Sequence, residues 1–275
     1  MTENTIIYQS SKIFYRTTGA GRPIILIHGF GEDGQIWDQQ VAFLKDHFYL
    51  IIPDLPGSGR SEMIKDMSIE GLAEVIKAVM DLELSRSPLQ GAEGVEGAFL
   101  LGHSMGGYIT LAFAEKYPNL LSSFALVHSS AFADSEEKKS VRLKSIEFIK
   151  RNGAHEFLKA AIAGLFISSG PSRWPLELIE KGKDFTDEAI IQYYQAIINR
   201  PDRTAVLKTF SNPILFIIGE QDKAVPFQQS LQQCYLPNRS HIHILRNSAH
   251  MGMLEEEEKV NNIIFQFYNT FLTSS

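Results

Sequence analysis

One serine lies in a glycine-rich run that could carry nucleophilic chemistry. The run 102–107 reads GHSMGG, follows an apolar segment that favours a strand and precedes a segment that favours a helix. This is the G-x-S-x-G pattern, in which a sharp strand-to-helix turn holds the serine in a strained backbone conformation. Side chains two residues before and after the serine would collide in such a turn, which explains the glycines. The pattern predicts that Ser104 is a nucleophile.

A serine hydroxyl is a weak nucleophile, so this chemistry needs a histidine base and a carboxylate that orients it. Asp222 and His250 each stand in a loop just after an apolar run that favours a strand. The carboxyl ends of parallel strands share one edge of a sheet, so Ser104, Asp222 and His250 are expected to meet there. Glu220 is the alternative acid. It follows its strand directly and would lie too deep to reach His250, so Asp222 is preferred.

A second loop could supply hydrogen-bond donors to the reaction. The residues 28–31 read HGFG and follow the first apolar run of the parallel type. Acyl transfer needs donors for the negative charge that develops on the carbonyl oxygen. We expect these donors to be the backbone N–H groups of Phe30 and Met105. The side chains of Trp37 and Met251 adjoin the same loops and are the candidates for lining the substrate pocket.

Other conspicuous residues have structural explanations. His103 is expected to pack beneath the turn rather than to take part in chemistry. His241 and His243 share one face of a predicted strand, but no third ligand at a suitable spacing is nearby, so we expect no metal. The glycine-rich run lacks the lysine of a phosphate-binding loop, and we therefore expect no nucleotide. Chemistry by Ser104, His250 and Asp222 needs no cofactor, so we expect none.

The elements that must position these residues alternate along most of the chain. Short apolar runs that favour strands alternate with segments of helical periodicity, and a β-prone pair at the N-terminus favours a hairpin. The stretch 132–210 instead contains successive helical patterns and no strand-like run. This organisation predicts an α/β protein with a doubly wound, mostly parallel sheet over 1–131 and 211–275. A helical cap is inserted over 132–210, and the Gly-, Ser- and Pro-rich stretch 85–97 is a surface connection.

The composition excludes several classes of protein. Hydrophobic residues make up 44% and charged residues 21% of the 275 residues, which argues against a disordered chain. The formal net charge of −6 makes nucleic acid and anionic membrane surfaces poor partners. Cys234 is the only cysteine, and the N-terminus lacks the features of a signal peptide. We expect a cytoplasmic protein with no membrane span that acts on a small molecule; its oligomeric state is left open.

Five segments carry a resemblance to a known family over nearly the whole chain. The segments HGFGEDGQIW, DLPGSGRS, GHSMGG, GEQD and SAH together resemble the α/β-hydrolase superfamily. The resemblance implies the α/β-hydrolase fold and a serine hydrolase that cleaves small carboxylic esters or thioesters through an acyl-enzyme. It implies Ser104, His250 and Asp222 as the catalytic triad. The segment DLPGSGRS is interpreted as a structural turn.

Departures from particular branches narrow this resemblance. Ser104 stands where epoxide hydrolases and dehalogenases carry an aspartate, which disfavours both. Met105 stands where proline iminopeptidases usually carry a tryptophan, and Tyr108 lies where menaquinone-pathway synthases tend to carry an arginine. Carbon–carbon bond hydrolases often share the Ser-Met-Gly-Gly turn, and they stay an alternative. A ligand sensor without enzymatic activity on the same scaffold is a second alternative, which the intact triad disfavours.

Overall fold

The computed structural model describes residues 1–86, 97–167 and 173–271, and its centre is one eight-stranded sheet. The strand order is β1-β2-β4-β3-β5-β6-β7-β8. The first two strands pair antiparallel with each other and β2 pairs antiparallel with β4, whereas all later pairs are parallel. The bounds are β1 (Thr2–Tyr8), β2 (Ser11–Thr18), β3 (Pro23–Ile27), β4 (Tyr49–Pro53), β5 (Ala98–His103), β6 (Leu121–Val127), β7 (Ile214–Gly219) and β8 (Ser240–Leu245).

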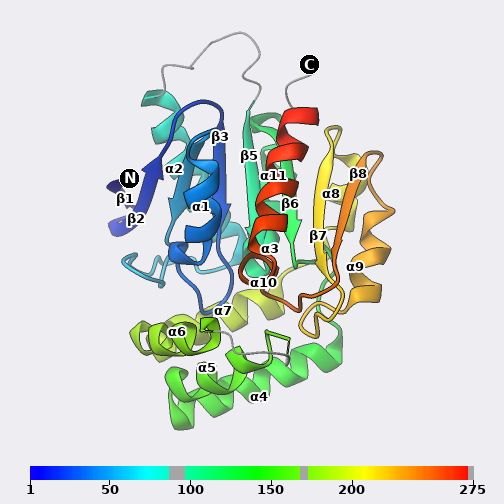
Figure 1. The fold of residues 1–275 in the computed structure, drawn as a ribbon. Helices are drawn as coiled ribbons and strands as arrows, with labels where there is room; N and C mark the ends of the chain where they lie inside the picture. The colour runs from blue at the N-terminus through cyan, green and yellow to red at the C-terminus, as the bar shows by residue number, and fades with distance from the viewer. Residues whose placement is uncertain (87–96, 168–172, 272–275) are drawn as a thin grey trace.

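The central strands β3, β5 and β7 are buried along their whole length because helices cover both faces of the sheet. Every residue of β3, β5 and β7 is buried, which is typical of parallel strands inside a doubly wound sheet. The helices α1 (Asp38–Leu44) and α11 (Glu257–Phe271) pack together on one face, and α2 (Ile69–Arg86) and α3 (Met105–Lys116) on the other (Figure 1). The predicted doubly wound, mostly parallel α/β sheet is therefore confirmed.

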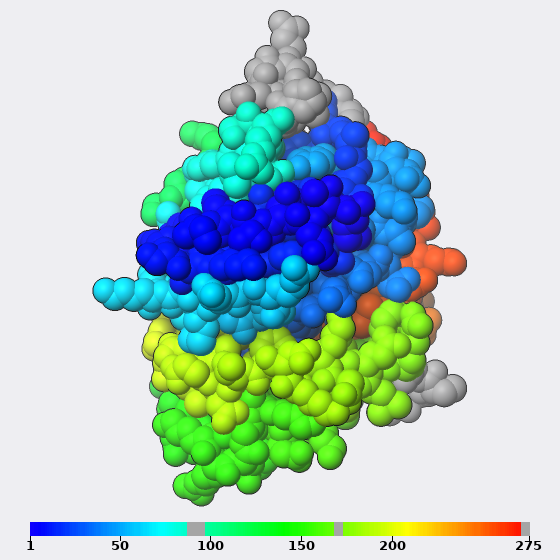
Figure 2. All heavy atoms as spheres, turned by 90° about the vertical axis from the view of Figure 1, so that its left-hand side faces the viewer, coloured from blue at the N-terminus to red at the C-terminus, as the bar shows by residue number. Residues whose placement is uncertain are grey.

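The N-terminal hairpin is present, with a two-residue turn between its strands. Gln9 and Ser10 form this turn with φ angles of 47° and 75°. Two positive φ angles in a row give the turn the twist that joins antiparallel strands. The hairpin lies at the edge of the sheet, and it forms the blue face that Figure 2 turns toward the viewer.

A helical block lies between β6 and β7. It contains α4 (Glu136–Asn152), α5 (Ala154–Ala163), α6 (Trp174–Lys181), α7 (Asp187–Asn199) and α8 (Thr204–Thr209). Figure 1 shows α4 to α7 gathered below the sheet, at the end toward which its parallel strands point. On the face seen in Figure 2, the segment containing α6 and α7 lies between the sheet domain and α4. The division into a core and a cap at residues 132 and 210 stays a prediction.

Two details differ from the sequence expectations or fall outside them. The helix α8 was not predicted, because a six-residue segment is too short to show helical periodicity; it packs against α3. The predicted surface connection 85–97 begins within α2, and its residues 87–96 lie outside the described residues. In the described part of the chain, no helix is both long and apolar enough to cross a membrane.

Candidate active site

Ser104 stands at a strained turn between β5 and α3. Its φ and ψ angles are 50° and −116°, and its backbone N–H donates to the carbonyl oxygen of Val127 at 3.0 Å. A Cβ atom on Gly102 would overlap the carbonyl oxygen of Gly106, and one on Gly106 would overlap the carbonyl oxygen of Ile27. The two glycines are therefore needed because backbone from the neighbouring strand and helix occupies the space of a side chain.

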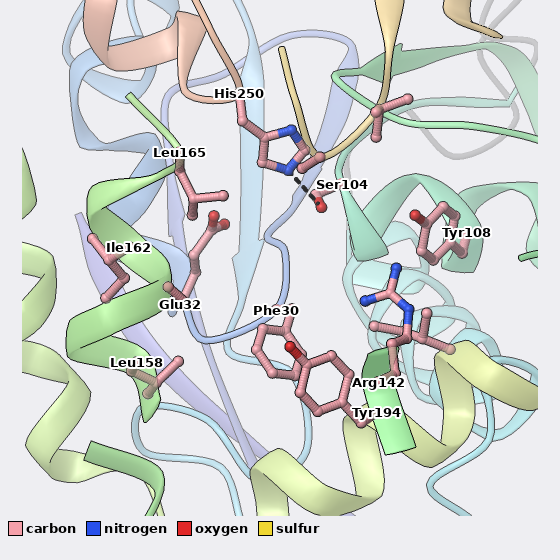
Figure 3. A pocket seen from close by; sticks show the side chains of 14 residues that line it. Phe30, Glu32, Ser104, Tyr108, Arg142, Leu158, Ile162, Leu165, Tyr194 and His250 are labelled. Carbon is pink, nitrogen blue, oxygen red and sulfur yellow. Dashed lines mark hydrogen bonds between the residues drawn. The ribbon is translucent and has the colours of Figure 1, made fainter. Parts of the chain in front are cut away.

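Three strand-end loops bring Ser104, His250 and Asp222 into one line. His250 Nε2 lies 2.9 Å from Ser104 Oγ, and its Nδ1 lies 2.8 Å from Asp222 Oδ2. Figure 3 shows the first of these contacts at the top of a cavity. The second carboxylate oxygen of Asp222 accepts the N–H groups of Ala224 and Val225 at 2.8 and 2.9 Å. Glu220, the alternative acid, is exposed to solvent.

The charged forms of Asp222 and His250 stabilise each other. Burial alone would raise the pKa of the Asp222 carboxyl, but the charges and hydrogen bonds of His250 and His128 together outweigh burial and lower this pKa well below its usual range. Burial likewise opposes protonation of His250, yet the Asp222 charge and hydrogen bond raise the pKa of its imidazole. The arrangement therefore favours an imidazole that can accept a proton while its tautomer is held by a carboxylate.

The two predicted hydrogen-bond donors lie beside the nucleophile. Met105 is the first residue of α3, so its N–H has no partner inside the helix. Phe30 follows β3 in a loop that touches Ser104, since a Cβ atom on Gly29 would lie 3.1 Å from Ser104 Cβ. Within the described residues, the backbone N–H groups of Phe30 and Met105 make no hydrogen bond. Both are thus available to an oxygen placed next to Ser104.

A buried ion pair that the sequence interpretation missed lies beneath the turn. Glu32 Oε2 accepts the N–H of Gly29 at 2.7 Å and lies 3.0 Å from His103 Nδ1. The other ring nitrogen, His103 Nε2, lies 3.0 Å from the carbonyl oxygen of His250. Both ring nitrogens face oxygen acceptors only, so both donate and the ring is an imidazolium. Burial alone would raise the pKa of Glu32, but the charge and hydrogen bond of His103 lower it.

His128 is a second histidine that lies beside the carboxylate of Asp222. It follows β6 with a φ angle of 49°, and its Nδ1 lies 3.6 Å from Asp222 Oδ2. Burial lowers the pKa of His128 to about 4, so the ring is neutral at neutral pH. Its Nε2 accepts the N–H of Gly252 at 3.2 Å, which puts the single ring proton on Nδ1, toward Asp222.

A cavity of about 160 Å³ opens directly onto Ser104 and His250. In Figure 3, helix α5 supplies the apolar wall on the left, and Tyr108, Arg142 and Tyr194 lie on the right. The lining residues are Phe30, Glu32, Ser104, Tyr108, Arg142, Leu158, Ala161, Ile162, Leu165, Tyr194, Ile197, Ala224, Val225 and His250. Half of these fourteen lining residues therefore come from the segment between β6 and β7.

Two residues expected in the pocket do not line this cavity. Trp37 and Met251 are both fully buried, and neither contributes to its wall. Trp37 packs edge-on against His103, with ring centroids 6.4 Å apart. Trp37 and Met251 are close in sequence to the catalytic loops, but their side chains point into the core. The cavity is walled instead by residues such as Tyr194 and Arg142.

Possible metal ligands and the one thiol lie outside the arrangement of Ser104, His250 and Asp222, apart from the triad's own acid and base. Over the ranges that the structure describes, no group of three His, Cys, Asp or Glu side chains could hold a metal ion. Cys234 is buried in α9 (Phe227–Cys234), and burial raises the pKa of its thiol to about 12. A thiol in this state is a poor nucleophile.

Comparison with known proteins identifies the class of protein that this fold and site belong to. The family model of the alpha/beta hydrolase family matches residues 24–263, so the chain belongs to that family. A thermophilic esterase from Thermogutta terrifontis has a similar structure, with a TM-score of 0.85, 27% identity and full coverage of both chains. The family resemblance and the α/β-hydrolase fold expected from the five sequence segments are therefore confirmed.

Curated relatives are hydrolases with different substrates. A pimeloyl-[acyl-carrier protein] methyl ester esterase from Sodalis glossinidius is 26% identical over 86% of this chain and 90% of its own length. A 2-hydroxy-6-oxononadienedioate/2-hydroxy-6-oxononatrienedioate hydrolase from Paraburkholderia phymatum is 25% identical over 93% of this chain and 90% of its own length. The protein is thus a hydrolase of the alpha/beta family, and these names leave its substrate open.

Proposed function

We propose that the protein is a serine hydrolase that cleaves small carboxylic esters or thioesters through an acyl-enzyme. The observation that carries this proposal is the line Ser104–His250–Asp222, with separations of 2.9 and 2.8 Å. Nucleophile, acid and base come from three loops at one edge of the sheet, and they follow one another along the chain in the order that this fold uses for acyl transfer. The esterase relatives support an ester as substrate.

The mechanism follows from the hydrogen bonds of the site. His250 Nε2 removes the proton from Ser104 Oγ as Oγ attacks the carbonyl carbon, and Asp222 stabilises the imidazolium that forms. The N–H groups of Phe30 and Met105 bind the oxyanion, and loss of one such donor costs about 3 kcal/mol of transition-state stabilisation. The C–O bond then breaks, and His250 gives its proton to the leaving alkoxide. Water, activated by His250, hydrolyses the acyl-Ser104 ester and regenerates the hydroxyl. No metal or organic cofactor takes part in this scheme.

The helices between β6 and β7 are proposed to act as the cap predicted for residues 132–210. Three of them, α4, α5 and α7, contribute side chains to the cavity that opens onto Ser104. The backbone N–H of His250 donates to the carbonyl oxygen of Leu165, just after α5, at 2.9 Å. This bond joins the loop of the base to the helical block. The buried, unpaired Cys234 also suits the reducing cytoplasm expected from the sequence.

The decisive experiment is labelling with a fluorophosphonate probe, which reacts with an activated serine. We expect covalent modification of Ser104, no labelling of Ser104→Ala, and strongly reduced labelling of His250→Ala. Peptide mass spectrometry should place the adduct on Ser104. Labelling at another residue, or equal ester turnover by wild type and Ser104→Ala, would overturn the proposal.

A carbon–carbon bond hydrolase with the same triad is the second candidate. Its support is the similarity to the relative from Paraburkholderia phymatum over 93% of this chain. A comparison of turnover on short esters and on vinylogous diketones separates the two. A kcat/KM that is higher for the diketones would favour this candidate over the esterase.

A further inference from the structure

Two charged side chains face the cavity over Ser104 from opposite walls. Figure 3 shows the carboxylate of Glu32 on the side of α5, and the guanidinium of Arg142 between Tyr108 and Tyr194 on the other side. Neither side chain takes part directly in the acyl-transfer steps described above. The two side chains differ in whether a buried group of opposite charge already neutralises them. Glu32 has such a partner, whereas Arg142 shares one with a second arginine.

The charge of Glu32 is already neutralised. Its Oε2 accepts the N–H of Gly29 and the Nδ1–H of His103, and the ring of His103 is an imidazolium because both of its nitrogens face acceptors. Glu32 and His103 thus form a neutral pair. Asp222 is also paired, since it accepts hydrogen bonds from His250 and from two backbone N–H groups. Neither carboxylate leaves an uncompensated negative charge for a cationic ligand.

The charge around Arg142 is not neutralised. Its Nε donates to Asp134 Oδ2 at 2.6 Å, but the other oxygen of the same carboxylate accepts Arg200 Nη2 at 2.9 Å. The side chains of Asp134 and Arg200 are only 2% and 4% exposed, so water cannot screen the cluster well. One carboxylate shared by two guanidinium groups leaves one positive charge in excess.

A third cation increases this excess. Lys138 lies one helical turn before Arg142 on α4, and its Nζ donates to the neutral amide oxygen of Gln229 at 3.2 Å. Burial lowers the pKa of Lys138, which indicates that its charge is costly where it stands. Within the described residues, the two Nη groups of Arg142 donate to no carboxylate. They present planar, charged donors to a cavity that opens onto the nucleophile.

We propose that Arg142 binds a carboxylate carried by the substrate, so that the preferred esters are short and anionic. The inference rests on the proposed serine-hydrolase function and names the substrate class of that site. A guanidinium matches a carboxylate with two parallel hydrogen bonds, and an anion there would neutralise the excess charge of the Arg142–Asp134–Arg200 cluster. The cavity of about 160 Å³ is close in volume to one known to hold benzene, which limits the substrate to a few carbon atoms.

The carboxylate can belong to either half of the ester, and two matched substrate pairs distinguish the halves. Monomethyl glutarate and methyl 5-methylhexanoate differ only by a carboxylate or an isopropyl group at the end of the acyl chain. Acetoxyacetate and isobutyl acetate differ in the same way on the alcohol side. We expect wild type to have a higher kcat/KM for the acid in one of the two pairs. A preference for the uncharged member of both pairs would overturn the inference.

Variants of α4 test whether Arg142 causes this preference. We expect Arg142→Gln to lower the acid-to-isostere ratio of kcat/KM by about 10- to 100-fold, since charged hydrogen bonds are lost. Arg142→Lys keeps the charge without the planar fork and should retain part of the ratio. The matched control is Arg151→Gln, because Arg151 is exposed on the same helix and should leave the ratio unchanged. Equal losses for both members of a pair in Arg142→Gln would show a structural role only and would overturn the inference.

A binding measurement separates failure of this inference from failure of the proposed function. Calorimetry on Ser104→Ala, which has no nucleophile, should show tighter binding of monomethyl glutarate or acetoxyacetate than of the uncharged isostere. The difference should disappear in the double variant Ser104→Ala/Arg142→Gln. If this pattern holds but wild type hydrolyses none of the four esters, the carboxylate site stands and the esterase proposal fails. Equal or absent binding of acid and isostere overturns the carboxylate site, whatever the turnover.

Discussion

His103 holds the backbone of His250: its Nε2 donates to the carbonyl oxygen of His250 at 3.0 Å, while its Nδ1 donates to Glu32. The residue before the candidate nucleophile is thereby tied to the candidate base by a bond that does not involve the line Ser104–His250–Asp222. Because the bond is made by a charged and fully buried ring, it depends on the Glu32 carboxylate.

We therefore expect Glu32→Gln to reduce kcat without removing Ser104 reactivity. The neutral amide cannot balance an imidazolium, so His103 loses a proton and one of its two hydrogen bonds. A shift of the His250 backbone should lower kcat about 10- to 100-fold, as small misplacements do. Breaking the buried pair should lower the free energy of unfolding by about 3 kcal/mol, measured by urea denaturation.

The matched control for this variant is Glu180→Gln. Glu180 is exposed and pairs with Lys183 on the surface, so its loss should change stability by less than about 1 kcal/mol. If Glu32→Gln lowered stability but left kcat and its pH profile unchanged, Glu32 would have no role in positioning His250.

The variants Asp222→Asn and Glu220→Gln should show which of the two candidate acids acts on His250. The amide keeps the shape of the side chain but can stabilise neither the imidazolium nor the required tautomer of His250, so kcat should fall about 10⁴-fold. Glu220→Gln should leave kcat within about twofold of wild type, because surface changes away from a site rarely matter. The opposite outcome, with Glu220→Gln inactive and Asp222→Asn active, would exchange the two assignments.

The pH dependence of kcat/KM should report the raised pKa of His250. The base works only when its imidazole is neutral, so activity is lost as the pH falls through this pKa. Since Asp222 raises it, the midpoint of the acidic limb should lie above about pH 6.5, the ordinary value of a histidine. Initial rates from pH 5 to 9 on a short ester measure it. A midpoint well below that value would mean that the Asp222 charge does not act on His250.

His128 should make the folded protein sensitive to acid. The buried ring has a pKa of about 4, whereas the same ring in the unfolded chain binds a proton near pH 6.5. Between these values the unfolded state binds more protons, so the free energy of unfolding falls as the pH is lowered, by up to about 3 kcal/mol from this residue. Protonation would also place a second donor against the N–H of Gly252.

Urea denaturation at pH 7 and pH 4.5 tests this expectation. The loss of stability between the two values should be smaller in His128→Gln than in wild type, even if the variant is less stable at both. His47→Gln is the control, because His47 is exposed. An equal pH-dependent loss in wild type and His128→Gln would assign the acid sensitivity to other groups.

Much of the fold and of the triad geometry follows from local sequence signals. The mostly apolar runs of β3, β5 and β7 are typical of strands between two layers of helices, and the glycines around Ser104 are required by a turn of a few residues. Such signals lie within a short stretch of chain, which is why they can be interpreted without knowing the rest of the fold. The helix α8 is too short to give one.

The wall of the cavity could not be predicted in the same way. Glu32 and His103 are 71 residues apart, and Arg142 meets the cavity only because α4 packs against α5 and α7. Which way a side chain points depends on these long-range contacts, as the buried Trp37 shows by packing against His103 instead of lining the cavity. A buried ion pair also leaves no periodic pattern, since each partner is a single polar residue among apolar neighbours.

The origin of the cavity wall has a consequence for how such an enzyme can diversify. Ser104, Asp222 and His250 lie on loops of the sheet, whereas Arg142 and the apolar wall of α5 belong to a single insertion between β6 and β7. Exchanging that insertion for one of different charge would alter which molecules reach the nucleophile while leaving the bond-breaking groups untouched. The residues proposed for selectivity and those proposed for chemistry thus lie on separate segments of the chain, and grafting the insertion onto another sheet offers a route to engineered selectivity.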